Sequence, residues 1–229
     1  MQKSLVFGLI GLIAGLAIGF FGANALNREN SLSNGNGASR TIPSSSNSFS
    51  ANAVSSNGQS LPAVDVLIEQ AKSEPQNFGI QMRTGDMYAQ IGRFDQAVEY
   101  YKKGLVLKPN DFNENVVLAN ALFDSRRFEE AEGYYAKAVA INGKDVNART
   151  DLGTTFVERA TPDLERAIKE FQAALEIEPN HEPSLYYLGI AYHRKGDAEN
   201  AAKSLARLEK VNPTSDLIGR LKQNLNPPQ

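Results

Sequence analysis

Four segments of the chain repeat one pattern: GRFDQAVEYYKKGLVLKPN (92–110), RRFEEAEGYYAKAVAINGK (126–144), DLERAIKEFQAALEIEPNH (163–181) and KGDAENAAKSLARLEKVNP (195–213). The alanines that they share are Ala97, Ala131, Ala167 and Ala201, at spacings of 34, 36 and 34 residues. A large side chain follows each alanine four residues later, at Tyr101, Tyr135, Phe171 and Leu205. Because residues four apart lie on one helix face, each segment predicts a helix that turns this face toward a partner.

A second apolar stretch precedes each of these segments. Its shared feature is a Leu-Gly pair or a near match: Thr84-Gly85, Leu118-Ala119, Leu152-Gly153 and Leu188-Gly189. A large residue follows three positions later, at Tyr88, Leu122, Phe156 and Tyr192. The whole pattern resembles the tetratricopeptide repeat (TPR) family, which repeats a pair of helices every 34 residues. The chain departs from the family by having no tryptophan and by placing Gly143 where the closing proline is usual.

The resemblance implies an all-α fold, a right-handed α-solenoid of about four helix hairpins. One hairpin cannot bury its apolar face alone, but stacked hairpins share a continuous core. The expected repeats span 78–111, 112–145, 146–181 and 182–215, preceded by one helix of a truncated repeat at 61–77 and followed by a capping helix and tail at 216–229. The third repeat has two extra residues near Thr161-Pro162-Asp163, where Thr161 is the expected helix cap.

The N-terminal segment is apolar without interruption from Leu5 to Ala23. Nineteen helical residues rise about 28 Å, which is close to the thickness of the hydrocarbon core of a bilayer. Residues 1–26 are therefore predicted to form a single transmembrane helix, and Ala23-Asn24-Ala25 leaves a cleaved signal peptide as the alternative. Lys3 favours a cytoplasmic N-terminus, with the repeats in the periplasm or otherwise outside the cytoplasm, anchored to the inner membrane.

Three glycines within this segment, Gly11, Gly15 and Gly19, are spaced by four residues. Such a face lets two membrane helices approach closely, which predicts homo-oligomers or pairing with another membrane helix. Residues 27–60 hold 11 Ser, 7 Asn and 3 Gly with only isolated apolar side chains, so they are predicted to be a disordered linker.

Composition excludes several classes of function. The 24 Lys and Arg balance 26 Asp and Glu, which argues against a nucleic-acid partner. The absence of cysteine removes disulfides, thiol nucleophiles and thiolate metal sites. His181 and His193 form no ligand-spaced pair, and no catalytic motif is present. We therefore expect no catalytic residues, no metal and no cofactor, and the protein is not expected to be an enzyme.

The resemblance implies that the first helix of each repeat lines an inner groove that binds peptides or other proteins. Periodicity places the following side chains on the face of these helices that is not used for packing: Met82, Asp86, Asn120, Phe123, Asp151, Thr154, Tyr186, Tyr187, Ile190 and His193. A further column holds Gln90, Asp124, Glu158 and Arg194. No lysine stands in these columns, so the carboxylate clamp of the chaperone-binding members is not expected. Asn120 is either a ligand for a peptide backbone or a solvated surface residue.

The layout of anchor, linker and repeats is similar to the membrane-anchored TPR subunits of cytochrome c maturation, and to the single-span repeat protein that accompanies the bacterial secretion channel. The resemblance implies a membrane-tethered module that binds client proteins during assembly or maturation. Two alternatives stay open. One is an oligomeric scaffold assembled through the glycine face, and the other is an accessory subunit of an enzyme carried by a separate chain.

Overall fold

The computed structural model describes residues 62–226, and every regular element in that range is an α-helix. The helices are α2 (Pro62–Ser73), α3 (Phe78–Gln90), α4 (Phe94–Leu107), α5 (Phe112–Asp124), α6 (Phe128–Ile141), α7 (Val146–Glu158), α8 (Leu164–Ile177), α9 (Glu182–Arg194), α10 (Ala198–Val211) and α11 (Asp216–Leu225). The predicted transmembrane helix, its glycine face and the linker lie outside the described residues. Within 62–226 no helix is long and apolar enough to cross a bilayer.

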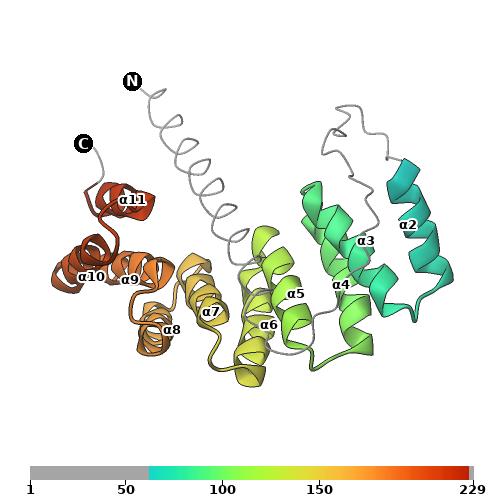
Figure 1. Ribbon diagram of the computed structural model, residues 1–229, viewed down its shortest axis with the longest axis horizontal. Helices are drawn as coiled ribbons and strands as arrows, with labels where there is room; N and C mark the ends of the chain where they lie inside the picture. The colour runs from blue at the N-terminus through green and yellow to red at the C-terminus, as the bar shows by residue number, and fades with distance from the viewer. Residues whose placement is uncertain (1–61, 227–229) are drawn as a thin grey trace. The chain divides into compact units, whose positions relative to one another are not determined.

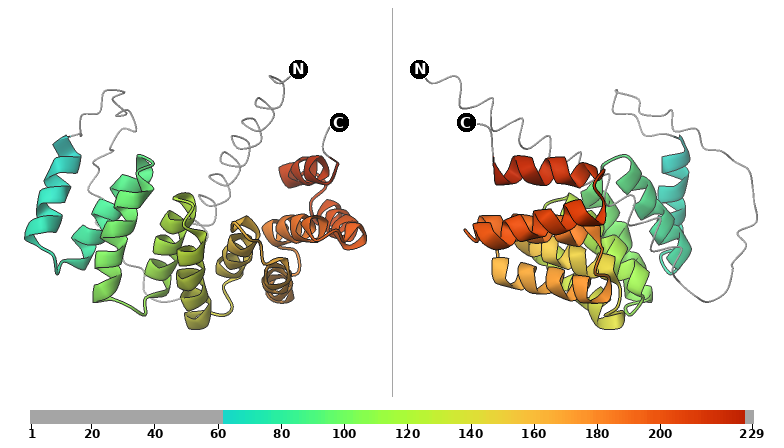
Figure 2. Two further views of the ribbon diagram at one scale, coloured as in Figure 1. Left: turned by 180° about the vertical axis from the view of Figure 1, so that it is seen from behind. Right: turned by 60° about the vertical axis from the view of Figure 1, so that its left-hand side comes forward.

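The helices pack in hairpins, and each hairpin stacks on the next. α3 packs on α4, α5 on α6, α7 on α8 and α9 on α10, while each second helix also contacts the first helix of the following pair. Figure 1 shows the resulting row of helices between α2 and α11, and Figure 2 shows the same row from behind and turned so that its left-hand side comes forward. The prediction of an all-α array of stacked helix hairpins is confirmed.

Each first helix begins at a polar residue in the same place of its repeat. Asn77, Asp111, Asp145 and His181 precede α3, α5, α7 and α9, and each side chain accepts a hydrogen bond from a backbone N–H of the first turn. These bonds satisfy donors that a helix start otherwise leaves unpaired. The period of the sequence therefore sets where the first helices start.

A small residue of a first helix receives a large side chain of the second helix in the same hairpin. A Cβ added at Gly85 would lie 2.5 Å from the ring of Tyr101, and one at Gly153 would lie 2.6 Å from the ring of Phe171. Tyr101 and Phe171 are both fully buried. The alternation of small and large residues in the sequence thus becomes the close contact between the paired helices.

The turn of the third repeat differs from the prediction at its cap. α8 begins at Leu164, and its first turn is capped by Asp163, whose Oδ1 lies 3.1 Å from the backbone nitrogen of Arg166, rather than by Thr161. The longer turn lies beside an ion-pair cluster in which Arg159 and Arg166 contact Glu132 at 3.0 and 2.9 Å. The two extra residues lengthen the connection without interrupting the stack.

α11 closes the array by packing on α9 and α10. Its Leu221 is fully buried and lies against the position of Gly189, where an added Cβ would meet the leucine at 2.9 Å. α11 therefore covers the last hairpin and lies where the first helix of a fifth repeat would lie.

Candidate functional site

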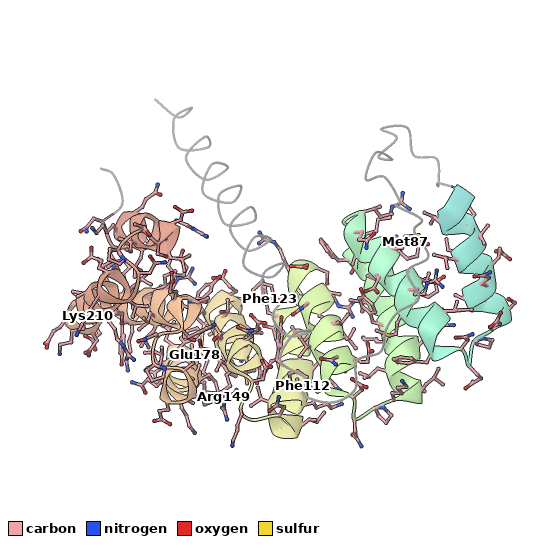
Figure 3. The ribbon with its side chains drawn as sticks, in the orientation of Figure 1. Met87, Phe112, Phe123, Arg149, Glu178 and Lys210 are labelled. Atoms are coloured by element: carbon pink, nitrogen blue, oxygen red, sulfur yellow. The ribbon has the colours of Figure 1, made fainter. Side chains whose placement is uncertain are left out.

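The candidate site is the side of α3, α5, α7 and α9 that does not pack on a second helix of the same hairpin, which we call the inner surface. α7 also contacts α9 directly, so these two successive first helices lie beside one another. Figure 3 marks the two ends of α5 with Phe112 and Phe123 and shows side chains along the length of the row. Whatever binds along this surface meets side chains from several repeats at once.

Two of the predicted site residues bind the second helix of their own hairpin. The Tyr101 hydroxyl donates to Oδ1 of Asp86 at 2.8 Å, and the Tyr135 hydroxyl donates to Oδ1 of Asn120 at 2.5 Å. The third and fourth repeats carry Thr154 with Phe171 and Ile190 with Leu205 at the same places, and neither pair includes a tyrosine. A tyrosine in the second helix therefore accompanies a polar acceptor in the first, and Asn120 is engaged within the protein by its oxygen.

Several predicted site residues are more buried than the periodicity indicated, because neighbouring helices cover them. The buried residues are Met82, Phe123, Asp151, Thr154, Tyr186 and Ile190. Met82 fills the space beside Gly104 of α4, and the ring of Phe123 packs edge-on against Phe128 at 5.0 Å. The Thr154 hydroxyl donates to the Thr150 carbonyl one turn earlier in α7. These predicted site residues are therefore largely covered by neighbouring side chains within the array.

The C-terminal part of the predicted site is partly covered by the capping helix. Tyr186 is only 2% exposed, with Arg220 over its ring at 5.4 Å and Asn224 within 3.4 Å of its hydroxyl. Tyr187 is half-buried and stacks on Phe171 at 6.0 Å. His193 is exposed. Only Tyr187 and His193 of the predicted aromatic and imidazole groups on α9 remain open to a ligand.

The central helices carry carboxylates in unusual environments. Burial raises the pKa of Asp124, the last residue of α5, to about 6. Burial, together with the charges of Asp145 and Asp124, raises the pKa of Asp151 on α7 to about 8. Burial also raises the pKa of Glu114 in the first turn of α5 to about 7, with Asp111 and Asp86 adding to the effect. The middle of the inner surface is therefore rich in carboxyl groups held away from water.

One carboxylate of the same surface is matched by a cation of the chain. Arg194, the last residue of α9, places its guanidinium 3.4 Å from Glu158, the last residue of α7, and donates to the Val157 carbonyl at 2.9 Å. Arg194 is therefore occupied within the array. Arg83, a basic residue of the first helix α3, is exposed.

His181, the N-cap residue of α9, has a structural role. Its Nδ1 lies 2.8 Å from the Ser184 hydroxyl and its Nε2 lies 3.1 Å from Oδ1 of Asn147, so it joins α9 to α7. Burial lowers the pKa of His181. Among residues 62–226 no group of three or more His, Asp or Glu side chains is arranged to hold a metal ion.

Family models described as "Tetratricopeptide repeat" match residues 80–111, 116–182 and 158–225. Together these matches cover more than half of the 229 residues and correspond to helices α3 to α11. The chain belongs to the tetratricopeptide repeat superfamily. No curated protein matches the sequence.

Solved structures of similar fold include a crystal structure of MamA, with 23% identity and a TM-score of 0.60 over 66% of this chain and 87% of that one. MamA 41-end from Desulfovibrio magneticus RS-1 has 25% identity and a TM-score of 0.61 over 67% of this chain and 86% of that one. YrrB, described as a TPR protein with an unusual peptide-binding site, has 21% identity and a TM-score of 0.62 over 70% and 82% of the two chains. These likenesses support the fold.

Glu114 was not among the predicted site residues, whereas Asp124 stood in the further column that the sequence placed on the groove face. Asp124, Glu158 and Arg194 each end a first helix, and the sign of the charge changes along this column. The burial that raises the pKa of Glu114 and Asp124 depends on neighbouring repeats and is not visible in one repeat of the sequence.

Proposed function

We propose that the chain is a TPR module that binds other proteins by holding an extended segment of the partner along the inner surface. The observation that carries this proposal is the row of first helices, each packed on its second helix by one side and open to a ligand by another. Stacked helix pairs of this kind create extended binding surfaces. The half-buried and exposed groups Asn120, Asp124, Tyr187 and His193 supply polar and aromatic contacts there. Binding rather than catalysis suits such a surface.

The proposal can be tested with photo-crosslinking side chains placed on opposite sides of the array. The full chain is first used to select peptides from a displayed random library. A crosslinker at His193, exposed on the first helix α9, should then label the selected peptides. A crosslinker at Val106, which is 78% exposed on the second helix α4, should not. Equal labelling at both positions, or a failure to select any peptide, would contradict the proposal.

We further propose that residues 1–26 tether this module to the inner membrane, with the repeats outside the cytoplasm, and that the clients are exported proteins under assembly or maturation. The apolar run from Leu5 to Ala23 after Lys3 supports the tether. Protease added to spheroplasts should digest the repeats, and the mature chain should begin near Met1. A mature start at Leu26, or full protection from protease, would count against the tether.

The second candidate is an oligomeric scaffold, and the spacing of Gly11, Gly15 and Gly19 favours it. A leucine at position 15 would hold two such helices apart. Gly15→Leu should therefore lower crosslinking between copies in membranes, while a substitution of Leu12 on another face should not. Equal crosslinking of the wild type and Gly15→Leu would remove this candidate.

A further inference from the structure

Asp151 is a buried carboxylate to which the described part of the chain supplies no partner. It lies in the middle of α7 and is only 7% exposed. No hydrogen bond or ion pair to its carboxylate is formed within residues 62–226. The side-chain oxygen and nitrogen atoms of this range that are both sealed from water and unpaired are Gln81 Oε1, Asn115 Oδ1 and Arg159 Nε. Since the Asp151 oxygens are not among them, part of the remaining exposure of Asp151 lies at its carboxylate.

The titratable groups that interact with Asp151 are all acidic or neutral. Asp124 comes from α5, and Asp145 is the N-cap of α7. The hydroxyls of Tyr135 on α6 and Tyr187 on α9 are the other titratable groups that interact with Asp151. Asp124 also forms no ion pair or hydrogen bond through its side chain within 62–226. Ionising a buried carboxyl group without a partner is costly, so a cation brought to this place would stabilise the carboxylate in a way that the described residues do not.

The contact between the third and fourth repeats shows how such a carboxylate pairs with a cation. Asp124, Glu158 and Arg194 each end a first helix, so they occupy the same position in successive repeats. Between the third and fourth repeats, Arg194 brings a guanidinium to Glu158 at 3.4 Å. Between the second and third repeats, the position of that arginine is held by Glu158 itself. The array therefore supplies a cation to Glu158 and none to Asp124.

We propose that Asp124 and Asp151 form a receptor for one cationic side chain, a lysine or an arginine, of the partner segment bound along the inner surface. The inference rests on the proposed function, because it names the chemistry of the segment that the surface takes. The guanidinium or ammonium group stands between α5 and α7 as Arg194 stands between α7 and α9. Asn120 lies one turn before Asp124 on α5, and Tyr187 of α9 interacts with Asp151.

The receptor couples binding to the release of a proton. In the free protein the pKa of Asp151 is about 8, so the carboxyl group is mostly protonated at neutral pH. A cation bound next to it favours the carboxylate, and the proton then passes to the solvent. The affinity for a basic segment is therefore expected to rise as the pH rises toward the pKa of Asp151. Burial, together with the charges of Asp145 and Asp124, opposes ionisation of Asp151 in the free protein, and the entering cation offsets this cost.

The test uses peptides selected by the full wild-type chain from a displayed random library. Each peptide is then synthesised with arginine or with its uncharged analogue citrulline, and with lysine or norleucine. Charged hydrogen bonds contribute about 1.5–3 kcal/mol, so loss of the cation should weaken binding by about 10–100-fold. Asp151→Asn and Asp124→Asn should cause a loss of similar size. Glu176→Gln, which removes an exposed carboxylate of the second helix α8, is the matched control and should cause none.

The variants are combined with the peptide analogues to separate the outcomes. If the receptor exists, replacing arginine by citrulline in the peptide should lower its affinity for Asp151→Asn only a little further. The release of a proton on binding should also disappear in that variant, as calorimetry in buffers of different ionisation enthalpy can measure. Peptides that bind the wild type and both variants equally, or that carry no basic residue, would overturn the receptor and leave the proposed function standing. Selection of no peptide by the wild type would overturn the proposed function and the receptor together.

A further variant supplies the cation from the protein itself instead of from the peptide. Glu158→Arg places an arginine beside Asp124 in the way that Arg194 lies beside Glu158. It should weaken the binding of arginine-containing peptides while leaving the helical content unchanged. Undiminished binding of these peptides to Glu158→Arg would overturn the receptor.

Discussion

Replacing Gly153 with alanine should destabilise the array by about 1–2 kcal/mol, although alanine is the better helix former. An added Cβ would lie 2.6, 2.9 and 3.0 Å from Cε1, Cδ1 and Cζ of Phe171. The Phe171 ring is 0% exposed and belongs to the facing helix α8, so it cannot turn into solvent. Overpacking of this kind costs about 1–3 kcal/mol. The gain in helix propensity offsets about 0.5–1 kcal/mol of it.

Gly133 offers a matched control, since it is exposed in α6 and an added Cβ would have no heavy atom within 4 Å. Gly133→Ala should therefore be more stable than the wild type by about 0.5–1 kcal/mol. Guanidinium unfolding followed by circular dichroism measures both variants, and whole curves are compared because repeat arrays can unfold in parts. A Gly153→Ala chain as stable as Gly133→Ala would refute the claim that close helix contact requires glycine at position 153.

Two further predictions concern the polar groups of the first helices. Because the pKa of Asp151 is raised from 3.8 to about 8 on folding, the unfolded chain loses this proton first, and wild-type stability falls as the pH rises from about 4 to about 8. The unfolding free energy of Asp151→Asn should therefore exceed that of the wild type by a difference that grows by up to about 1.4 kcal/mol per pH unit in this window. Denaturant titrations at several pH values measure this difference, and a difference that does not change with pH would contradict the prediction. Tyr135→Phe leaves Oδ1 of Asn120 without its donor and should cost about 1 kcal/mol. Adding Asn120→Thr copies the Thr154 and Phe171 pair of the third repeat and should recover most of that loss in the same titration, whereas an unchanged loss would count against the pairing.

The sequence alone was sufficient for the helix pairs and their stacking. Small and large residues recur at the same places, as at Gly85 with Tyr101 and Gly153 with Phe171, and these pairs meet in the structure. Such prediction works because the contacts of a repeat array are made within a hairpin or with the next one, so a short period of sequence specifies most of them. The sequence predicted the cap of α8 two residues too early, at Thr161 instead of Asp163, because both residue types are favourable helix N-caps.

The candidate site followed from the sequence only in part. Periodicity placed Asp86 and Asn120 on the first helices but could not show that tyrosines of the second helices bind them. It placed Tyr186 on the groove face but could not show that α11 covers this side chain. Those outcomes depend on how far a side chain of one helix reaches toward another, which the period of a single helix does not contain.

The sequence by itself determined the repeat, the positions where the first helices start and the contacts between small and aromatic residues, because all of these depend on residues within about one repeat of each other. Only the tertiary structure decided which side chains of the first helices remain accessible and how their charges are matched. Asp124 and Glu158 occupy the same position of their repeats, yet Arg194 reaches Glu158 while Asp124 receives no cation from residues 62–226. The physical reason is that burial and electrostatic matching arise from the neighbours that stacking brings to each position, and these neighbours differ from one repeat to the next.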